Sequence, residues 1–147
     1  MKTTETKQTQ LSGRGALDRL KKFMPVAEFN VLKSALRGEE RDGFADMLRG
    51  MAARVGAMPL TYQQDGKGDA AMVYLHYFTP ASDWYITEKD VDVETLQAYG
   101  YAMLNGDRIN AEMGYISIDE LISNGAELDL HFTPRSLGAI KEKGETK

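Results

Sequence analysis

Acidic and histidine side chains are the residues of this chain whose types and spacing could support chemistry. Cysteine is absent, so a thiol nucleophile, a disulfide and a thiolate metal site are excluded. Two or three carboxylates with a histidine can hold Mg²⁺ or Mn²⁺ and promote phosphodiester cleavage. One hypothesis is therefore a metal-dependent nuclease for single-stranded nucleic acid that uses Glu88, Asp90 and His131. Trp84 or Tyr85 would then stack on a base.

The spacing of these residues weakens the nuclease hypothesis. Glu88 and Asp90 share one face of an extended strand and the lysine between them points to the other, so the three converge only at a bulge or turn. Neither histidine belongs to an HxH or HExxH motif. His76 lies in an aromatic segment and is expected as a buried ring with a satisfied nitrogen, whereas His131 could pair with a carboxylate such as Asp83 or Glu88. We therefore expect no metal and no cofactor, and leave enzymatic activity open.

Formal charge is distributed unevenly along the 147 residues. Residues 1–60 hold 11 Lys/Arg against 7 Asp/Glu, whereas residues 61–147 hold 7 against 15. Within 83–129 the counts are 2 against 11. Such a field repels phosphate and attracts basic surfaces, so it disfavours duplex nucleic acid as a partner of the C-terminal half. The alternative interpretation is an acidic face that only keeps the protein soluble.

The segment YLHYFTPASDWYITEKD, residues 74–90, contains the only tryptophan. Its rings could line a ligand pocket or form the core of a sheet, and apolar residues on both faces of 74–78 favour a covered strand. The predicted binding surface consists of residues at the polar end of this segment and in the acidic stretch that follows it. It comprises Trp84, Tyr85, Thr87, Glu88, Asp90, Asp92 and Glu94.

Hydrophobic periodicity changes from helical to strand-like along the chain. Helical spacing predicts helices over 15–23, from Pro25 to about 38, and over 40–57. Alternation and aromatic content then predict five strands, with a short helix at 118–125 before the last one. Ser117 and Glu120 form a capping box for that helix, and Gly125 occupies the place of a left-handed C-terminal cap. The predicted strands are 71–79, 83–89, 98–104, 112–118 and 126–133.

This order predicts an α+β fold with N-terminal helices followed by an antiparallel sheet. We expect a single domain over 14–138, helical in 14–58 and mainly β in 70–134, between disordered tails at 1–13 and 139–147. No run of about 18 uncharged apolar residues and no signal-peptide pattern occurs, so we expect a cytoplasmic protein without a membrane contact.

Three sequence blocks carry a resemblance to a known family. The segments YLHYFTPASDWYITEKD, EMGYISIDELI and ELDLHFTPRSL resemble the signature blocks of a bacterial domain-of-unknown-function family carried by plasmids, integrative elements and phages, over about residues 60–138. The family implies a mobile-element accessory protein and brings no catalytic residues or cofactor. The stretch after TEKD is shorter here than in many relatives. The matching residues are Phe78, Pro80, Trp84, Tyr85, Thr87, Glu88, Gly114, Tyr115, Ser117, Glu120, Leu121, Asp129, Leu130, Phe132, Pro134 and Leu137.

Charge and resemblance together predict a non-enzymatic protein of a phage or plasmid. It would bind a basic surface on a host, replication or defence protein through its acidic surface, and inhibition of a defence component is one version of this role. The nuclease is the first alternative. A regulator that binds DNA through helices within 15–57 is a second.

Overall fold

The computed structural model describes residues 11–90 and 96–143. It divides into two compact units, Met1–Gly56 and Ala57–Lys147. The division falls close to the predicted change from helix to sheet near residue 58. The predicted single domain stays a prediction.

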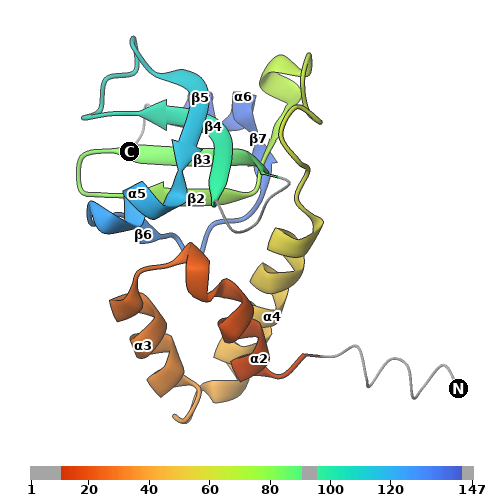
Figure 1. Ribbon diagram of the computed structural model, residues 1–147, viewed down its shortest axis with the longest axis vertical. Helices are drawn as coiled ribbons and strands as arrows, with labels where there is room; N and C mark the ends of the chain where they lie inside the picture. Colours follow the sequence, from red (N-terminus) through yellow and green to blue (C-terminus); the bar gives the residue numbers. More distant parts are fainter. Residues whose placement is uncertain (1–10, 91–95, 144–147) are drawn as a thin grey trace, which may run out of the picture. The chain divides into compact units, whose positions relative to one another are not determined.

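The first unit is helical, as predicted. It contains α2 (Gly13–Leu20), a 3₁₀ turn (Lys21–Phe23), α3 (Val26–Ala35) and α4 (Arg41–Ala57), which runs one residue past the division (Figure 1). Ser12 caps α2, because its Oγ accepts a hydrogen bond from the backbone N–H of Gly15 at 2.9 Å. The predicted tail therefore ends before Ser12, and its residues 1–10 lie outside the described residues. The buried helical side chains are Ala16, Leu17, Leu20, Phe29, Leu32, Leu48, Met51 and Val55.

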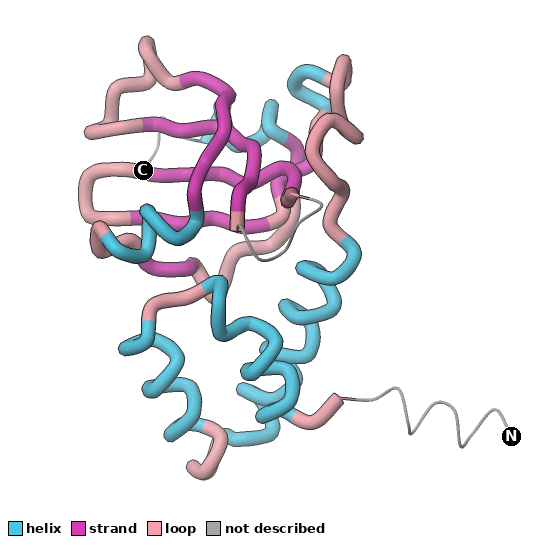
Figure 2. Tube along the Cα trace, viewed as in Figure 1, coloured by secondary structure: helices cyan, strands magenta, loops and turns pink. Residues whose placement is uncertain are grey.

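The second unit contains the predicted antiparallel sheet of five strands, which confirms the α+β fold (Figures 1 and 2). Four strands follow one another as a meander and the fifth returns to the other side, giving the order β5-β4-β3-β2-β6. β3 is the middle strand. The bounds are β2 (Leu75–Phe78), β3 (Asp83–Lys89), β4 (Gln97–Met103), β5 (Glu112–Ser117) and β6 (Glu127–Leu128).

The short helix before the last strand of this sheet is also confirmed. α5 (Ile118–Ser123) begins after Ser117, whose Oγ accepts a hydrogen bond from the N–H of Glu120. Gly125 follows the helix with a φ of +93°, the left-handed conformation expected of a C-terminal cap.

Two expectations about the C-terminal part were wrong. The strand predicted over 126–133 is paired only at Glu127–Leu128. The tail predicted from 139 begins as a helix, since α6 spans Leu137–Lys143. Before α6, β7 (Arg135–Ser136) pairs with β1 (Met72–Val73) in a separate two-stranded sheet.

A bulge in β3 determines which polar side chains of this strand are buried. The pairing with β4 shifts between Ile86 and Glu88, so Ile86 lies opposite Gly100, Glu88 lies opposite Tyr99, and Thr87 has no partner in the register. Thr87 is 0% exposed and Glu88 is 3% exposed. The extra residue therefore turns two successive polar side chains inward, which regular alternation would not do.

The two faces of the sheet are covered by different elements. On one face, α6 contributes Leu137 and Ile140 to a core that includes Tyr85, Met103 and Phe132. On the other face, α5 contacts β4 and β5. Among residues 11–90 and 96–143, no helix has the length and apolar character needed to span a membrane.

Candidate functional site

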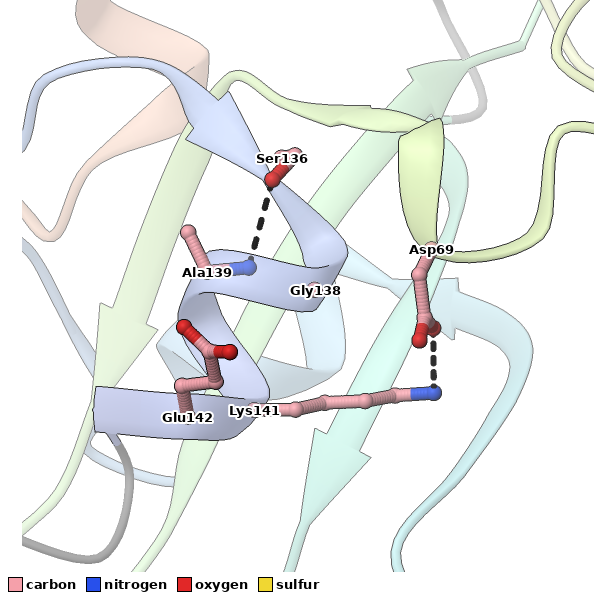
Figure 3. Close-up of a pocket in the computed structure, with 6 residues that line it drawn as sticks. All are labelled: Asp69, Ser136, Gly138, Ala139, Lys141 and Glu142. Atoms are coloured by element: carbon pink, nitrogen blue, oxygen red, sulfur yellow. Dashed lines mark hydrogen bonds and ion pairs between the residues drawn. The ribbon is translucent and has the colours of Figure 1, made fainter.

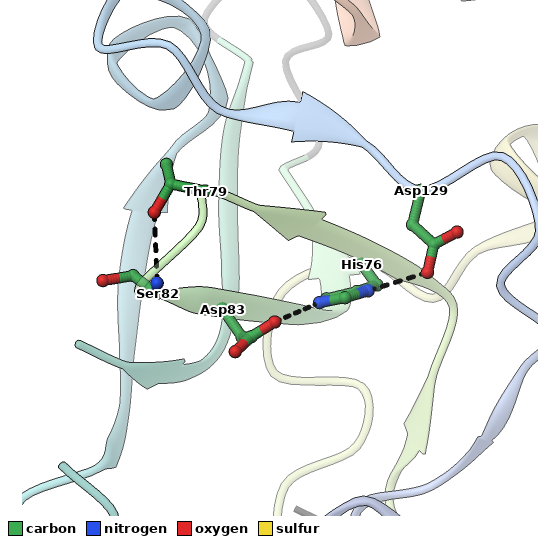
Figure 4. A network of polar contacts seen from close by, with 5 residues as sticks. All are labelled: His76, Thr79, Ser82, Asp83 and Asp129. Carbon is green, nitrogen blue, oxygen red and sulfur yellow. Dashed lines mark hydrogen bonds and ion pairs between the residues drawn. The ribbon is translucent and has the colours of Figure 1, made fainter. Parts of the chain in front are cut away.

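His76 is held between two carboxylates in the second unit (Figure 4). Its Nε2 lies 2.7 Å from Oδ1 of Asp83 on β3, and its Nδ1 lies 2.9 Å from Oδ2 of Asp129, which follows β6. The imidazole stacks on Tyr85, with ring centroids 4.6 Å apart and planes 7° from parallel. The backbone N–H of Asp129 also donates to the carbonyl of His76 at 2.8 Å. One ring therefore ties together β2, β3 and the segment after β6.

The charge state of this network follows from its geometry. Ionised carboxylates accept hydrogen bonds and do not donate them, so both ring nitrogens of His76 must carry hydrogen. Burial lowers the pKa of the imidazolium, but hydrogen bonds from the ring to Asp129 and Asp83 and their charges outweigh burial, so the pKa of His76 is raised. The hydrogen bond from His76 in turn lowers the pKa of the Asp129 carboxyl.

This arrangement makes His76 a structural residue. Both of its nitrogens are engaged, so neither can accept a proton from a substrate or coordinate a metal without breaking a buried ion pair. The expectation of a buried ring with a satisfied nitrogen is confirmed. The suggested pairing of the other histidine with Asp83 or Glu88 is not observed. His131 is exposed, and its backbone N–H donates to Oδ1 of Asp129 at 3.0 Å.

The predicted binding residues do not form one exposed surface. Tyr85, Thr87 and Glu88 are buried, and burial raises the pKa of Tyr85 to about 12. Trp84 and Asp90 are half-buried. The other two predicted residues, Asp92 and Glu94, lie outside the described residues. A partner can therefore reach Trp84 and Asp90 directly, whereas the three buried side chains act within the unit.

The alternative catalytic set has no metal-binding geometry in the described part of the chain. Glu88 is buried in β3, Asp90 follows that strand with its N–H donating to the carbonyl of Gln97, and His131 lies in the turn after β6. Within residues 11–90 and 96–143, no three His, Asp or Glu side chains form a group that could hold a metal ion. These contacts therefore give the nuclease hypothesis no support.

Glu88 lines a cleft of about 220 Å³ in the second unit, here called the Glu88 cleft. Its Oε1 accepts a hydrogen bond from the backbone N–H of Tyr62 at 2.7 Å, and its Oε2 accepts one from Oγ1 of Thr87 at 2.8 Å. Tyr62 has a φ of +77° and its hydroxyl bonds that of Tyr115. The polar, charged and aromatic residues that line the cleft are Gln64, Asp65, Asp69, Glu88, Tyr99 and Lys141.

A wider hollow of about 520 Å³ lies beside α6 and shares Asp69 and Lys141 with that cleft (Figure 3). Nζ of Lys141 lies 2.9 Å from Oδ1 of Asp69, and both side chains are substantially exposed. Oγ of Ser136 accepts a hydrogen bond from the N–H of Ala139 in the first turn of α6. No buried polar side chain lines this hollow among the described residues, so it offers no defined recognition chemistry.

A third hollow, of about 260 Å³, brings together Trp84 and one side of α5, which contributes Glu120 and Leu121. We call it the Trp84 hollow. Its lining includes Leu104 and Tyr115, which are 51% and 58% exposed. Glu120 lines it as well, Asp119 is adjacent on α5, and Glu112 pairs with the lining residue Ala102. These three exposed carboxylates, Glu112, Asp119 and Glu120, are called the acidic border below.

The chain was compared with protein families, curated proteins and solved structures, and none of them matches it. The resemblance of the three sequence blocks to a mobile-element family stays a prediction.

Proposed function

We propose that this protein is a non-enzymatic binding module whose second unit docks onto a basic surface of another protein. The observation that carries the proposal is the charge of the exposed side chains. In the described part of residues 57–147, the exposed Lys and Arg side chains are those of Lys67 and Arg108. The exposed carboxylates there are Asp65, Asp69, Asp107, Glu112, Asp119, Glu120, Glu127 and Glu142.

The Trp84 hollow supplies the apolar part of the proposed contact. Protein interfaces are commonly built from aromatic anchors surrounded by a polar rim. Trp84 and Leu104 offer the apolar surface, and the acidic border supplies charge that attracts lysine and arginine. The occupant we propose is a segment of a partner protein in which basic and apolar side chains alternate.

Support for the biological setting comes from the sequence resemblance. The three blocks over about residues 60–138 favour an accessory protein of a phage or plasmid. A basic partner would then be a host, replication or defence protein whose lysines and arginines otherwise contact nucleic acid. Occupation of those side chains by an acidic surface would inhibit such a protein.

The test uses Trp84 as a reporter, since it is the only tryptophan in the chain. A short peptide of alternating arginine and leucine, titrated into the full chain, should change the Trp84 fluorescence, and its binding should weaken as salt is raised. Neutralising the acidic border with Glu112→Gln, Asp119→Asn and Glu120→Gln should weaken binding about tenfold, because three exposed ion pairs contribute about 0.5 kcal/mol each.

The matched control removes the same charge from the first unit. Glu39→Gln, Glu40→Gln and Asp42→Asn are exposed positions there, and the triple variant should bind the peptide with less than a twofold change. Equal losses in the two triple variants would mean that net charge alone attracts the peptide. That result, or unchanged affinity in the border variant, would contradict the proposal.

A further inference from the structure

The Glu88 cleft contains a buried carboxylate that forms no ion pair within the described residues, because Lys141, the cation in the lining, bonds Asp69 instead. Glu88 is 3% exposed, and its two hydrogen-bond donors, the Tyr62 N–H and the Thr87 hydroxyl, are neutral. Among the described residues, no Lys, Arg or His forms an ion pair with this carboxylate. Burying a carboxylate is unfavourable unless it is paired, and its oxygens can accept about four hydrogen bonds, of which two are made. The cleft therefore has both the charge and the acceptor capacity for a cationic donor.

Gln64, the other buried polar residue that lines the cleft, makes no hydrogen bond to Glu88. Gln64 is committed elsewhere, because its Nε2 donates to the carbonyls of Met72 and Thr87 and its Oε1 accepts from the N–H of Met72. These three bonds fix the segment that forms one wall of the cleft. Gln64 is thus a structural residue and does not compete for a ligand.

The walls and mouth of the cleft fit a flat organic cation. Tyr99 lines it beside Glu88, its partner in the strand register, and Asp65 and Asp69 add negative charge at exposed positions. Lys141 shows that a cation is accommodated next to this site. Its Nζ bonds Asp69 and lies 5.4 Å from the centroid of the Tyr101 ring. An aromatic ring beside a carboxylate is a favourable environment for a guanidinium group, which stacks on rings and binds carboxylates in a bidentate manner.

We propose that the Glu88 cleft binds the guanidinium group of an arginine from the basic partner. This inference rests on the proposed function, because the arginine is supplied by the same partner surface. Guanidinium is preferred over ammonium because it is more weakly hydrated and loses less on entering a site of this depth. The Glu88 oxygens accept hydrogen bonds from two N–H groups of the guanidinium, and the Tyr99 ring provides the surface on which it stacks.

The experiment follows backbone amide signals by NMR while two peptides are added to the full chain. One peptide has a single arginine between glycines, and the other has citrulline, which is neutral and nearly isosteric, at the same position. The arginine peptide should shift the signals of Tyr62, Glu88 and Tyr99, whereas the citrulline peptide should leave them unchanged. Equal shifts with both peptides, or none with either, would overturn the inference.

Glu88→Gln tests the role of the carboxylate charge. The variant can keep the native fold, because glutamine can replace both hydrogen bonds of Glu88. The glutamine oxygen can accept from the Tyr62 N–H, its amide can donate to Oγ1 of Thr87, and that hydroxyl can donate to the carbonyl of Tyr99, which is already 3.0 Å away. The variant should bind the arginine peptide at least tenfold more weakly. Asp65→Asn, at an exposed position of the cleft, should weaken binding two- to fivefold and serves as the second variant if Glu88→Gln fails to fold.

Variants of the acidic border separate this inference from the proposed function. Glu120→Gln removes one charge outside the cleft and should leave single-arginine binding unchanged. If the border variants weaken the arginine-leucine peptide and Glu88→Gln weakens neither peptide, the cleft inference fails and the proposed function stands. If Glu88→Gln weakens both peptides and the border variants weaken neither, the proposed docking surface fails and the cleft remains.

Discussion

Replacing Gly100 with alanine should lower the free energy of unfolding of the second unit by about 3 kcal/mol or more. Gly100 lies in β4 opposite Ile86, beside the bulge of β3. A Cβ at this position would lie 2.1 Å from the carbonyl oxygen of Tyr85 and 3.0 Å from the Cα of Ile86. These are backbone atoms of the middle strand of the sheet, so they cannot rotate away. The clash can be relieved only by separating β3 from β4.

Gly114 is the matched control for this substitution. It pairs with Gly100 from the adjacent strand β5, and a Cβ there would meet nothing within 4 Å. Gly114→Ala should change the unfolding free energy by less than about 1 kcal/mol, with a gain expected because alanine restricts the unfolded chain. Urea unfolding is followed by the fluorescence of Trp84, the only tryptophan, which lies in this unit. A loss in Gly100→Ala no larger than in Gly114→Ala would show that β3 and β4 adjust easily.

Elements governed by local contacts could be predicted from the sequence. The strand DWYITEK has the predicted bounds, and α5 begins at the predicted cap. Both patterns depend on residues a few positions apart, namely alternation in the strand and the Ser117–Glu120 spacing. Gly125 was likewise identifiable, since a glycine after a helix commonly adopts the left-handed conformation that it has here.

Departures from these predictions have identifiable physical causes. The predicted strand 126–133 leaves the sheet early because the Asp129 side chain bonds His76 and the N–H of His131, which makes a turn. α6 was missed although its signals were present. Ser136 precedes it as a cap, and Leu137 and Ile140 are spaced for one buried helical face.

The site residues were only partly predictable because they depend on pairings between distant segments. Glu88 was identified by type and position, yet its burial results from a bulge that alternation does not reveal. Its contact with Tyr62 joins residues 26 positions apart, and the contact of His76 with Asp129 joins residues 53 positions apart. Strand register fixes such contacts, and a single sequence does not specify register.

Replacing His76 with leucine should destabilise the second unit by about 3–5 kcal/mol, because it leaves carboxylates without their cation in a buried site. Asp83 is most affected, since only 4% of this residue is exposed. His131→Leu is the matched control, because that ring is exposed, and it should change stability by less than about 0.5 kcal/mol. Urea unfolding at pH 6 measures both variants, and equal effects would contradict a special role for His76.

The contribution of His76 should also depend on pH in a defined direction. Its pKa is raised in the folded state, so its stabilising effect is complete below the unfolded pKa of about 6.5 and is lost as pH rises through the higher folded value. The pKa of Asp129 is lowered, so its effect is present above about 3.9 and is lost as pH falls through the depressed value. The stability advantage of the natural chain over His76→Gln should therefore be greatest between about pH 4 and 6.5.

A double-mutant cycle assigns this pH dependence to the ion pairs. In an Asp83→Asn and Asp129→Asn background, the ring has no charged partners, so the cost of His76→Gln should fall and its dependence on pH above 6.5 should largely disappear. Because His76 joins β2, β3 and the segment after β6, loss of its charge at high pH should first loosen the attachment of Asp129. Hydrogen exchange should therefore accelerate at the Asp129 amide before it does in β4, and uniform acceleration across the sheet would contradict this order.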